Sequence, residues 1–497
     1  METINNTQLK QKIIEDSQNF PEIRLKSDQI EIFDTFQDSH NQQILISITN
    51  INPIINLTFH QQNKDPQNIQ ITQIDLIGAI KTIQCQKIES KQYFGLEIHQ
   101  LQKQNPKKQR KQIFHTIYHE SEKKIEIWKN IILFYTRNSN FITENLQYLQ
   151  KQQLPIFNQK LLIFVNPAAG AGKSPNFWKD HQKLLDIAGF QYKQIDTEKL
   201  NHANEIILKM SSEELLSYQG IVTFSGDGLP HEIINAIQQR EDKEQALQIG
   251  ISALPGGSGN ALATSICKKA NEQLGMISSI YALIKGKKQN MDLIELQIDD
   301  QQKKIYSFVS INYAYIADCD INSEKLRCLG GARFDVYGFY RCLIQKKYPT
   351  KIYIKKQIQI DQQQNQQQNE EQQMKKEDWD LVQGNLKYLV ISNTPYIGET
   401  INSAPLAQID NGFCDIQILN NTSYISLYKF ALTFQNGTHF DIQKKIPKNK
   451  DMYYTNAKEF IIETDQKDSL FSIDGEKFTA QNLKGKVIPQ ALSVFTF

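Results

Sequence analysis

The chain has 497 residues, of which 40% are hydrophobic and 22% are charged, and its formal net charge is +2. This length allows about two to four domains with buried cores, and the composition excludes a fibrous or wholly disordered chain. The small net charge excludes a general attraction to nucleic acid, so no nucleic-acid partner is expected.

The N-terminal stretch METINNTQLKQKIIEDSQ is polar and lacks the apolar core of a signal peptide. No uninterrupted apolar run approaches the roughly 18 residues that a membrane span needs. The six cysteines form no Cys-x-x-Cys pair and no Cys/His metal spacing, which favours reduced thiols. The sequence therefore predicts a cytoplasmic protein that associates with membranes peripherally.

Residues 1–136 contain short stretches in which apolar residues alternate, as in QQILISITN and INLTF, and these predict half-buried strands. The segments YFGLEIHQL and QIFHTIYHE flank the basic loop NPKKQRKQ and predict a hairpin. The next segment, SEKKIEIWKNIILFYTR, has helical spacing, with Ser121 as the N-cap. Several strands closed by an amphipathic helix with a tryptophan are typical of a pleckstrin-homology-like (PH-like) domain that contacts lipid or membrane.

The basic loop of this region has two interpretations. It could meet anionic lipid headgroups, although a charge cluster of this size is more often the solvated tip of a hairpin. All glycine loops of catalytic type come later in the chain, so we expect catalysis to be independent of residues 1–136.

A polar linker is expected over residues 137–155, and the pattern changes after it. Over residues 156–295, the apolar strands LLIFV, GIVTFS and QIGISALP alternate with helices, which predicts an α/β domain with a parallel sheet. Each strand runs into a glycine-containing loop, and ligands bind at this carboxyl end of such sheets.

Strands dominate residues 296–497, as in IYSFVSINYAYIA and GFCDIQIL, and predict a mostly antiparallel β-sandwich domain. The glutamine-rich segment 361–378 has few apolar residues to bury and predicts a disordered insertion between two strands.

Four loops carry residues suited to chemistry, namely 166–173, 225–232, 255–263 and 474–476. The first ends in Gly-Lys-Ser and at first looks like a nucleotide-binding P-loop. However, Pro167 stands where that pattern requires its first glycine, and proline has no N–H to offer a phosphate.

The second loop places Asp227 between two glycines directly after a buried strand. A carboxylate there repels a bare phosphate, so it suits either a Mg²⁺ contact or the acceptance of a proton from an attacking hydroxyl. An isolated Gly-Asp-Gly would more often be a structural turn. The third loop, PGGSGNALA, places a glycine-rich nest before a helix, which is an arrangement that binds anions.

The motifs N-P-x-x-G-x-G-K, S-G-D-G-x-x-H-E, P-G-G-S-G-N-A-L-A and D-G-E occur in this order. Together they resemble the catalytic domain shared by diacylglycerol, ceramide and sphingosine kinases. Residues 310–334, SINYAYIADCDINSEKLRCLGGARF, are most similar to sphingosine kinases. The resemblance runs from residue 161 to the C-terminus, except for the glutamine-rich insert. It implies a two-domain lipid kinase that binds ATP and Mg²⁺ between an α/β domain and a β-sandwich.

By resemblance, Asp227 is the catalytic carboxylate that activates the primary hydroxyl of the lipid, and it is also the candidate Mg²⁺ contact. Ser310 and Asp320 are implied to face the polar head of the lipid substrate. His231 is expected to be a structural hydrogen-bonding group. The implied nucleotide-binding residues are Asn166, Gly172, Lys173, Thr197, Ser225, Gly226, Gly228, Gly257, Ser258, Gly259, Asn260, Glu324, Arg327, Arg333, Asp474, Gly475 and Glu476.

The leading hypothesis is an ATP-dependent sphingoid-base kinase. Ceramide or diacylglycerol kinase activity is the alternative among enzymes, and a non-catalytic lipid-binding adaptor is the alternative outside them. The choice depends on Asp320, because a sphingoid base carries an ammonium near its reactive hydroxyl and a buried cation needs a counter-ion. Asp318 is the other carboxylate that could take this role.

Overall fold

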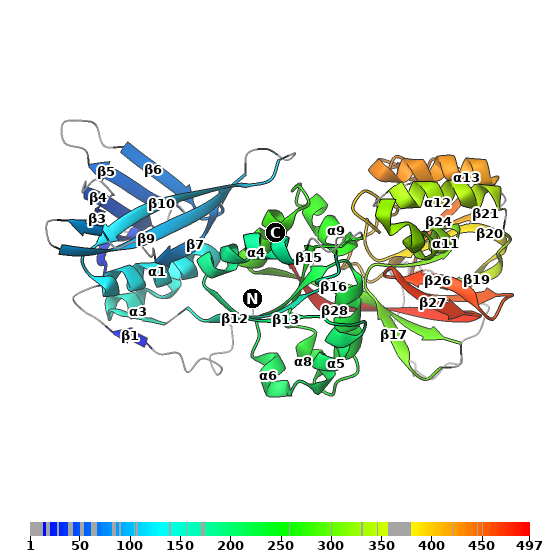
Figure 1. The fold of residues 1–497 in the computed structure, drawn as a ribbon, viewed down its shortest axis with the longest axis horizontal. Coiled ribbons are helices and arrows are strands. Elements are labelled where there is room, and N and C mark those ends of the chain that lie inside the picture. The colour runs from blue at the N-terminus through cyan, green and yellow to red at the C-terminus, as the bar shows by residue number, and fades with distance from the viewer. Residues whose placement is uncertain are drawn as a thin grey trace, which may run out of the picture.

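The computed structural model describes residues 13–15, 20–26, 29–37, 43–49, 54–60, 67–81, 86–88, 91–103, 105, 108–138, 141–155, 157–169, 174–257, 259–299, 301–329, 332–344, 346–355, 379–420, 422–444, 446–449 and 451–497. Three regions follow one another along the long axis of the molecule: an antiparallel sheet with one long helix, a central α/β layer, and a β-rich region capped by helices (Figure 1). The expected glutamine-rich insertion, 361–378, lies outside the described residues.

The first region, which we call the N-terminal unit, consists of an antiparallel sheet and helix α1 (Glu122–Arg137). Ser121 caps α1 by accepting a hydrogen bond from the Lys124 amide, and Trp128 is fully buried between the helix and the sheet. The predicted hairpin and helix are confirmed, whereas the PH-like identity of the unit stays a prediction. Its strands are β2 (Glu22–Lys26), β3 (Gln29–Gln37), β4 (Gln43–Thr49), β5 (Ile54–His60), β6 (Gln67–Thr72), β7 (Leu76–Lys81), β8 (Gln86–Ile88), β9 (Lys91–Gln102) and β10 (Lys111–His119).

The segment expected to be a polar linker instead forms regular structure. It contains α2 (Phe141–Glu144), α3 (Leu146–Gln150) and β11 (Gln153–Pro155), and β11 pairs with β1 (Ile13–Glu15). The apolar side chains scattered among its polar residues, Phe141, Leu149 and Leu154, are buried in the core of the N-terminal unit. The connection is therefore packed against that unit.

The central region contains a parallel sheet in the order β13-β12-β14-β15. Apolar clusters cover both faces of this sheet, as expected for strands that read as continuous hydrophobic runs. The strands are β12 (Gln159–Val165), β13 (Phe190–Asp196), β14 (Gly220–Ser225) and β15 (Ile251–Pro255), and the helices are α4 (Ser174–Ile187), α5 (His202–Lys209), α6 (Ser212–Leu216), α7 (Gly228–Ile237), α8 (Lys243–Ala246), α9 (Ala261–Lys269) and α10 (Met276–Lys285).

The C-terminal strand connects the central region to the β-rich region. Strand β28 (Asn482–Thr496) pairs in parallel with β15 through Val494 and Ile251, and antiparallel with β16 and β25. This continuity fixes the two regions relative to each other, so loops from both can form one site. The other strands are β16 (Lys287–Ile298), β17 (Lys304–Ser307), β18 (Ser310–Ala314), β19 (Pro349–Lys355), β20 (Asp380–Ser392), β21 (Cys414–Asn420), β22 (Phe440–Asp441), β23 (Ile446–Pro447), β24 (Met452–Ala457), β25 (Glu459–Thr464), β26 (Ser469–Ile473) and β27 (Glu476–Ala480).

The β-rich region also contains helices that the sequence analysis missed. The expected strand in IYSFVSINYAYIA ends at Ala314, whose φ of 62° breaks the extended backbone, and α11 (Tyr315–Asn322) begins there. Tyr315 and Cys319 of α11 pack against Tyr388 of β20 in a buried cluster. The remaining helices of this region are η2 (Ser323–Leu329), α12 (Ala332–Leu343), α13 (Tyr424–Ala431) and η4 (Leu432–Asn436).

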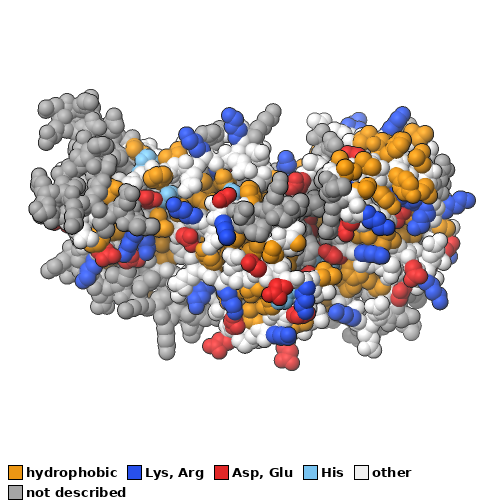
Figure 2. All heavy atoms as spheres, viewed as in Figure 1, with side chains coloured by type: hydrophobic (Ala, Val, Ile, Leu, Met, Phe, Trp, Pro, Cys, Tyr) orange, Lys and Arg blue, Asp and Glu red, His pale blue; other side chains and the backbone are white. Residues whose placement is uncertain are grey.

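Helices α12 and α13 leave an exposed apolar surface at one end of the molecule, which we call the α12–α13 face (Figure 2). Its exposed side chains are Leu329, Val336, Phe339, Tyr340, Leu343, Ile344, Ile425 and Leu432. Among the helices that the structure describes, none is both long and apolar enough to cross a bilayer.

Candidate active site

The glycine loops of the α/β region meet at the carboxyl edge of the parallel sheet. The Asn166 amide donates to the Phe224 carbonyl (3.1 Å), and the Gly256 amide donates to the Ser225 carbonyl (2.9 Å), so the loops after β12, β14 and β15 lie side by side. Thr197 lies at the same edge, where its amide donates a hydrogen bond to the carbonyl of Val165, the last residue of β12. The expected gathering of these loops is therefore present in the structure.

Glycines lie where the second, third and fourth loops touch, and glycine is required at Gly257, where the contact is with backbone atoms. A Cβ atom on Gly257 would lie 2.4 Å from Gly226 Cα, and one on Gly228 would lie 2.4 Å from Glu476 Oε1. A Cβ atom on Gly259 would lie 2.8 Å from Asp227 Oδ2. Since real Cβ atoms do not approach so closely, these glycines let three loops pack around one carboxylate.

Asp227 is buried at the start of α7, and its carboxylate is held by the first turn of α9. Its Oδ2 accepts a hydrogen bond from the Ala261 amide (2.7 Å), and its Oδ1 accepts one from the Leu262 amide (3.2 Å). Burial raises the pKa of Asp227 to about 6, and the nearby charges of Asp474 and Asp320 act in the same direction, against the two amides. Asp227 is thus a fixed carboxylate that exchanges a proton close to neutral pH, as a general base requires.

Asn260 shapes the loop that precedes α9. Its backbone has a φ of 58°, which asparagine tolerates better than most residues. Its side chain accepts from the Gly257 amide (3.1 Å) and donates to the Gly257 carbonyl (2.8 Å) and to Glu399 Oε1 (2.6 Å). The sequence analysis missed Glu399, because its segment, NTPYIGETINS, carries no motif that it recognised.

The carboxylate of Asp474 is engaged in hydrogen bonds within the protein, and the nucleotide contact that the resemblance implied for it stays a prediction. Its carboxylate bonds to His231 Nδ1 (2.8 Å) and accepts from Ser307 Oγ (2.7 Å). It also accepts from the backbone amides of residues 308, 309 and 310. These five hydrogen bonds join the turn between β26 and β27 to α7 and to the start of β18. His231 is therefore a structural hydrogen-bonding group, as expected.

Asp320 and Arg333 lie on the β-rich side of the site. Asp320 Oδ2 accepts a hydrogen bond from Ser472 Oγ (2.5 Å). Burial raises the pKa of Asp320 to about 6, against the opposing effects of Ser472 and the Arg333 charge and with the added effect of Glu324 and Glu476. The charge of Asp320 also contributes to the raised pKa of Asp227.

Arg333 provides a positive charge on the described part of the site. Its side chain is buried, and its Nε has no hydrogen-bond partner among the described residues. A buried guanidinium with an unsatisfied N–H group suits an anionic ligand, and its planar fork matches phosphate oxygens. This geometry fits the nucleotide role expected for Arg333.

Asp318, the alternative counter-ion, is engaged elsewhere. Its carboxylate forms an ion pair with Arg341 (2.7 Å) and accepts a hydrogen bond from the Tyr348 hydroxyl. Because Arg341 already neutralises it, Asp318 does not offer a negative charge to a ligand. Asp320 is therefore the better candidate for a substrate contact.

Across the described ranges, no three His, Cys, Asp or Glu side chains converge closely enough to hold a metal ion. Mg²⁺ in kinase sites is usually held by one or two carboxylates together with substrate phosphates and water. The site therefore fits a metal that arrives with the nucleotide and contacts a single carboxylate.

The other expected site residues fall into two groups. The Ser310 amide donates to Asp474 (3.0 Å), Gly475 occupies the positive-φ turn beside it, and Glu324 is exposed on η2. Outside the described residues lie Gly172, Lys173 and Ser258, and the side chain of Arg327.

Comparison with known proteins places this site in a family. Residues 160–296 match the model of the diacylglycerol kinase catalytic domain. The chain belongs to the diacylglycerol kinase catalytic-domain family. Residues 370–496 match the model of the YegS C-terminal NAD kinase beta sandwich-like domain. The lipid-kinase α/β domain and the β-sandwich that follows it are thereby confirmed.

Several proteins that the chain resembles in sequence are named sphingosine kinases. The chain is 27% identical to sphingosine kinase 1 of Arabidopsis thaliana over 64% of this chain and 68% of that protein. It is 28% identical to sphingosine kinase 1 of Mus musculus over 67% of this chain and 90% of that protein. A shorter match, to sphingosine kinase 2 of Homo sapiens, is 36% identical over 35% of this chain and 27% of that protein. The protein is thus a lipid kinase of the diacylglycerol kinase family.

Proposed function

We propose that this lipid kinase transfers the γ-phosphate of ATP to the primary hydroxyl of a sphingoid base. The observation that carries the proposal is the position of Asp320, a half-buried carboxylate that shares the site with Asp227 and Arg333. Its charge offers a partner to the ammonium of a sphingoid base, which ceramide and diacylglycerol lack. The similarity to proteins named sphingosine kinase supports the same choice.

The chemistry of this reaction is assigned to Asp227. The carboxylate accepts the proton of the lipid hydroxyl while the lipid oxygen forms a bond to the γ-phosphorus. The bond from that phosphorus to the β,γ-bridging oxygen breaks, and ADP leaves. The amides of Ala261 and Leu262 orient the carboxylate for this step, and Arg333 binds phosphate oxygens.

Mg²⁺ is the metal we propose for this site, with Asp227 as its protein ligand. When bound, it supplies positive charge that offsets the charge of the transferring phosphate. Lys173 and Arg327 stay predicted nucleotide contacts.

The test of the proposal is the variant Asp320→Asn, which keeps the size of the side chain and removes its charge. A charged hydrogen bond contributes about 1.5–3 kcal/mol, so kcat/KM for sphingosine should fall about 10- to 100-fold. Phosphorylation of any neutral lipid alcohol that the enzyme accepts should change much less. Asp415→Asn is the matched control, because Asp415 is also buried in the β-rich region and its pKa is also raised to about 6 by burial. Normal use of sphingosine by the Asp320 variant would remove Asp320 from substrate recognition.

We further propose that the enzyme meets its lipid at a membrane through the α12–α13 face. Lys347 and Lys429 are exposed on or directly after these helices, and they suit the anionic headgroups around an apolar contact. Phe339→Asp should weaken binding to anionic liposomes several-fold and spare activity on detergent-dispersed lipid. Phe114→Asp is the matched control on the N-terminal unit, since the two phenylalanines are 56% and 55% exposed. A larger loss for the Phe114 variant would move the membrane contact to the N-terminal unit.

A further inference from the structure

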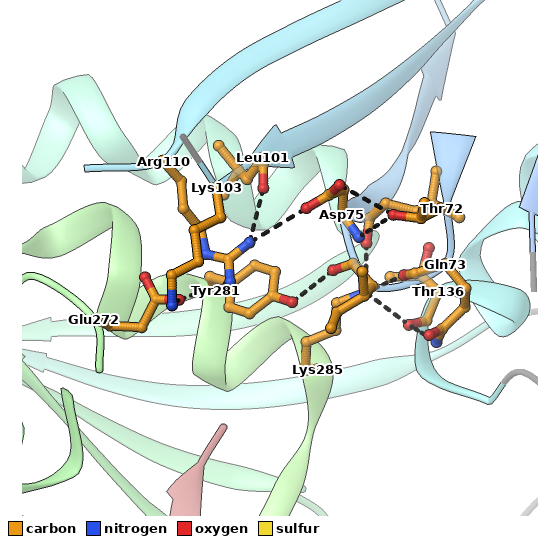
Figure 3. Close-up of polar contacts among 12 residues, drawn as sticks. Thr72, Gln73, Asp75, Leu101, Lys103, Arg110, Thr136, Glu272, Tyr281 and Lys285 are labelled. Atoms are coloured by element: carbon orange, nitrogen blue, oxygen red, sulfur yellow. Dashed lines mark hydrogen bonds and ion pairs between the residues drawn. The ribbon is translucent and has the colours of Figure 1, made fainter. Parts of the chain in front are cut away.

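The N-terminal unit is joined to the kinase region by buried polar and apolar contacts (Figure 3). Arg110, from the basic hairpin loop, forms an ion pair with Glu272 (2.7 Å), and their side chains are only 5% and 3% exposed. The Arg110 guanidinium also stacks on the ring of Tyr281 in α10, 3.7 Å from its centroid. Arg110 therefore faces the kinase region, whereas Lys108 and Lys111 of the same loop are exposed.

Further contacts extend this interface. Lys285 of α10 donates to the carbonyls of Gln73 (2.5 Å) and Leu76 (2.7 Å), and Tyr281 donates to the carbonyl of Ile74 (2.5 Å). Ile77 and Leu101 of the N-terminal unit belong to a buried apolar cluster that includes several residues of α4 and α10. The two regions thus share a core, unlike modules joined by a flexible linker.

Glu272 is locked to the end of helix α9. Its amide donates to the Cys267 carbonyl (2.8 Å), and the Asn271 amide donates to the Lys268 carbonyl (3.1 Å), with Asn271 at a φ of 54°. This pair of bonds is a Schellman motif, which ends a helix with a fixed geometry. Lys103 adds a hydrogen bond to the Asn271 carbonyl (3.0 Å) and an ion pair to Glu272 (2.9 Å). Positive charges at this end also suit the helix dipole.

The opposite end of the same helix holds Asp227. Helix α9 has nine residues, so about 13 Å of rigid helix separates the amides of Ala261 and Leu262 from the Schellman motif. A displacement at Glu272 is therefore transmitted to the amides that orient the carboxylate.

We propose that Arg110 is a positioning residue of the kinase reaction, which acts through Glu272 and helix α9 on the amides that hold Asp227. This revises the expectation that residues 1–136 are independent of catalysis. The inference rests on the proposed role of Asp227 and does not depend on which lipid is phosphorylated.

The experiment compares full-length Arg110→Ala with wild type, using whichever lipid the wild-type enzyme phosphorylates. We expect kcat to fall about 10-fold, because small misplacements of a catalytic group reduce rates strongly. KM for ATP and KM for the lipid should change much less than kcat, because the variant leaves the residues proposed to bind the two substrates in place. A purely structural role would lower stability and leave kcat of the folded enzyme unchanged.

Arg24→Ala is the matched control. Like Arg110, Arg24 forms an ion pair, with Glu31 (3.1 Å), and stacks on an aromatic ring, that of Phe33. Its side chain is half-exposed, however, and makes no described contact with the kinase region. It should leave kcat unchanged. Glu272→Gln, which keeps the side-chain size, repeats the test if Arg110→Ala does not fold.

Amide hydrogen exchange gives a readout that is independent of activity. Exchange over residues 256–269 should become faster in the Arg110 and Glu272 variants, whereas exchange in β12 and β14 should not change. Unchanged exchange there together with a wild-type kcat would overturn the inference. Faster exchange without activity of the wild-type enzyme on sphingosine would contradict the proposed substrate but not the positioning role.

Discussion

Two buried, charged regions of this molecule, the site around Asp227 and the interface around Arg110, are built in opposite ways. In the site, the charge of Asp320 adds to the raised pKa of Asp227, and the buried side chain of Arg333 forms no ion pair with a described residue. At the interface, Arg110 forms ion pairs with Glu272 and Asp75. Buried charges without a partner in the protein are typical of a site that binds a charged ligand. Buried charges that pair with each other hold two regions together.

The largest expected effect comes from removing the Asp227 carboxylate from the site. Asp227→Asn should lower turnover by about 10²- to 10⁴-fold, the usual contribution of a general base. Folding should not be impaired, because the pKa of Asp227 is raised above its usual value, so the ionised form destabilises the folded state above pH 6. Turnover, ATP binding and denaturant unfolding measured on one preparation check this. Near-normal turnover would remove Asp227 from the mechanism.

At the interface, the expected effect is on stability. Glu272→Ala leaves Arg110 buried without its main partner, so the free energy of unfolding should fall by about 3–5 kcal/mol. The exposed pair in the same unit provides the control: Glu31→Ala should cost at most about 1 kcal/mol. Equal losses in the two variants, measured by urea unfolding, would show that the interface pair is no more important than a surface pair.

A variant of Arg333 should distinguish nucleotide binding from lipid binding. Arg333→Ala removes the buried guanidinium, and KM for ATP should rise about 10-fold or more, as expected from the loss of a charged hydrogen bond. KM for the lipid should change much less. Steady-state kinetics with each substrate varied in turn measure both constants, and a change confined to the lipid KM would place Arg333 on the wrong substrate.

The smallest expected effect is the change of activity with pH near neutral pH. The pKa values of Asp227 and Asp320 are both raised to about 6, and the reaction needs both carboxylates ionised when the substrate is a sphingoid base. Activity should approach its full value above about pH 7 and fall below that pH, with a slope that approaches about 100-fold per pH unit for two groups. In Asp320→Asn the slope should drop to about tenfold per unit. Identical slopes in the two enzymes would exclude Asp320 as a titrating group of the reaction.

The contrast between the site around Asp227 and the interface around Arg110 also shows what the sequence could predict. The glycine loops and Asp227 are local patterns at the ends of strands, so the sequence analysis found them. The contact between Arg110 and Glu272 joins residues that are 162 positions apart, and neither stands in a motif. Loop NPKKQRKQ was therefore interpreted from its charge alone, and Arg110 proved to be a buried interface residue.

Helix α11 and the internal hydrogen bonds of Asp474 were missed for a similar reason. The alternating apolar residues of IYSFVSINYAYIA continue past Ala314, but packing against β20 favours a helix from Tyr315 onward. Asp474 lies in a recognisable D-G-E motif, yet its hydrogen bonds to α7 and to the start of β18 depend on tertiary structure. Motifs identify which residues matter, and only the fold shows which of them remain available to a ligand.

The central claim is that the site around Asp227 selects a sphingoid base. The most direct test offers the enzyme labelled ATP together with sphingosine, ceramide or diacylglycerol in parallel reactions. Each lipid should be dispersed in the same detergent, with Asp227→Asn as the background control. The account predicts that sphingosine is phosphorylated with the highest kcat/KM and that the label in its product requires Asp227. A preference for ceramide or diacylglycerol over sphingosine would contradict it.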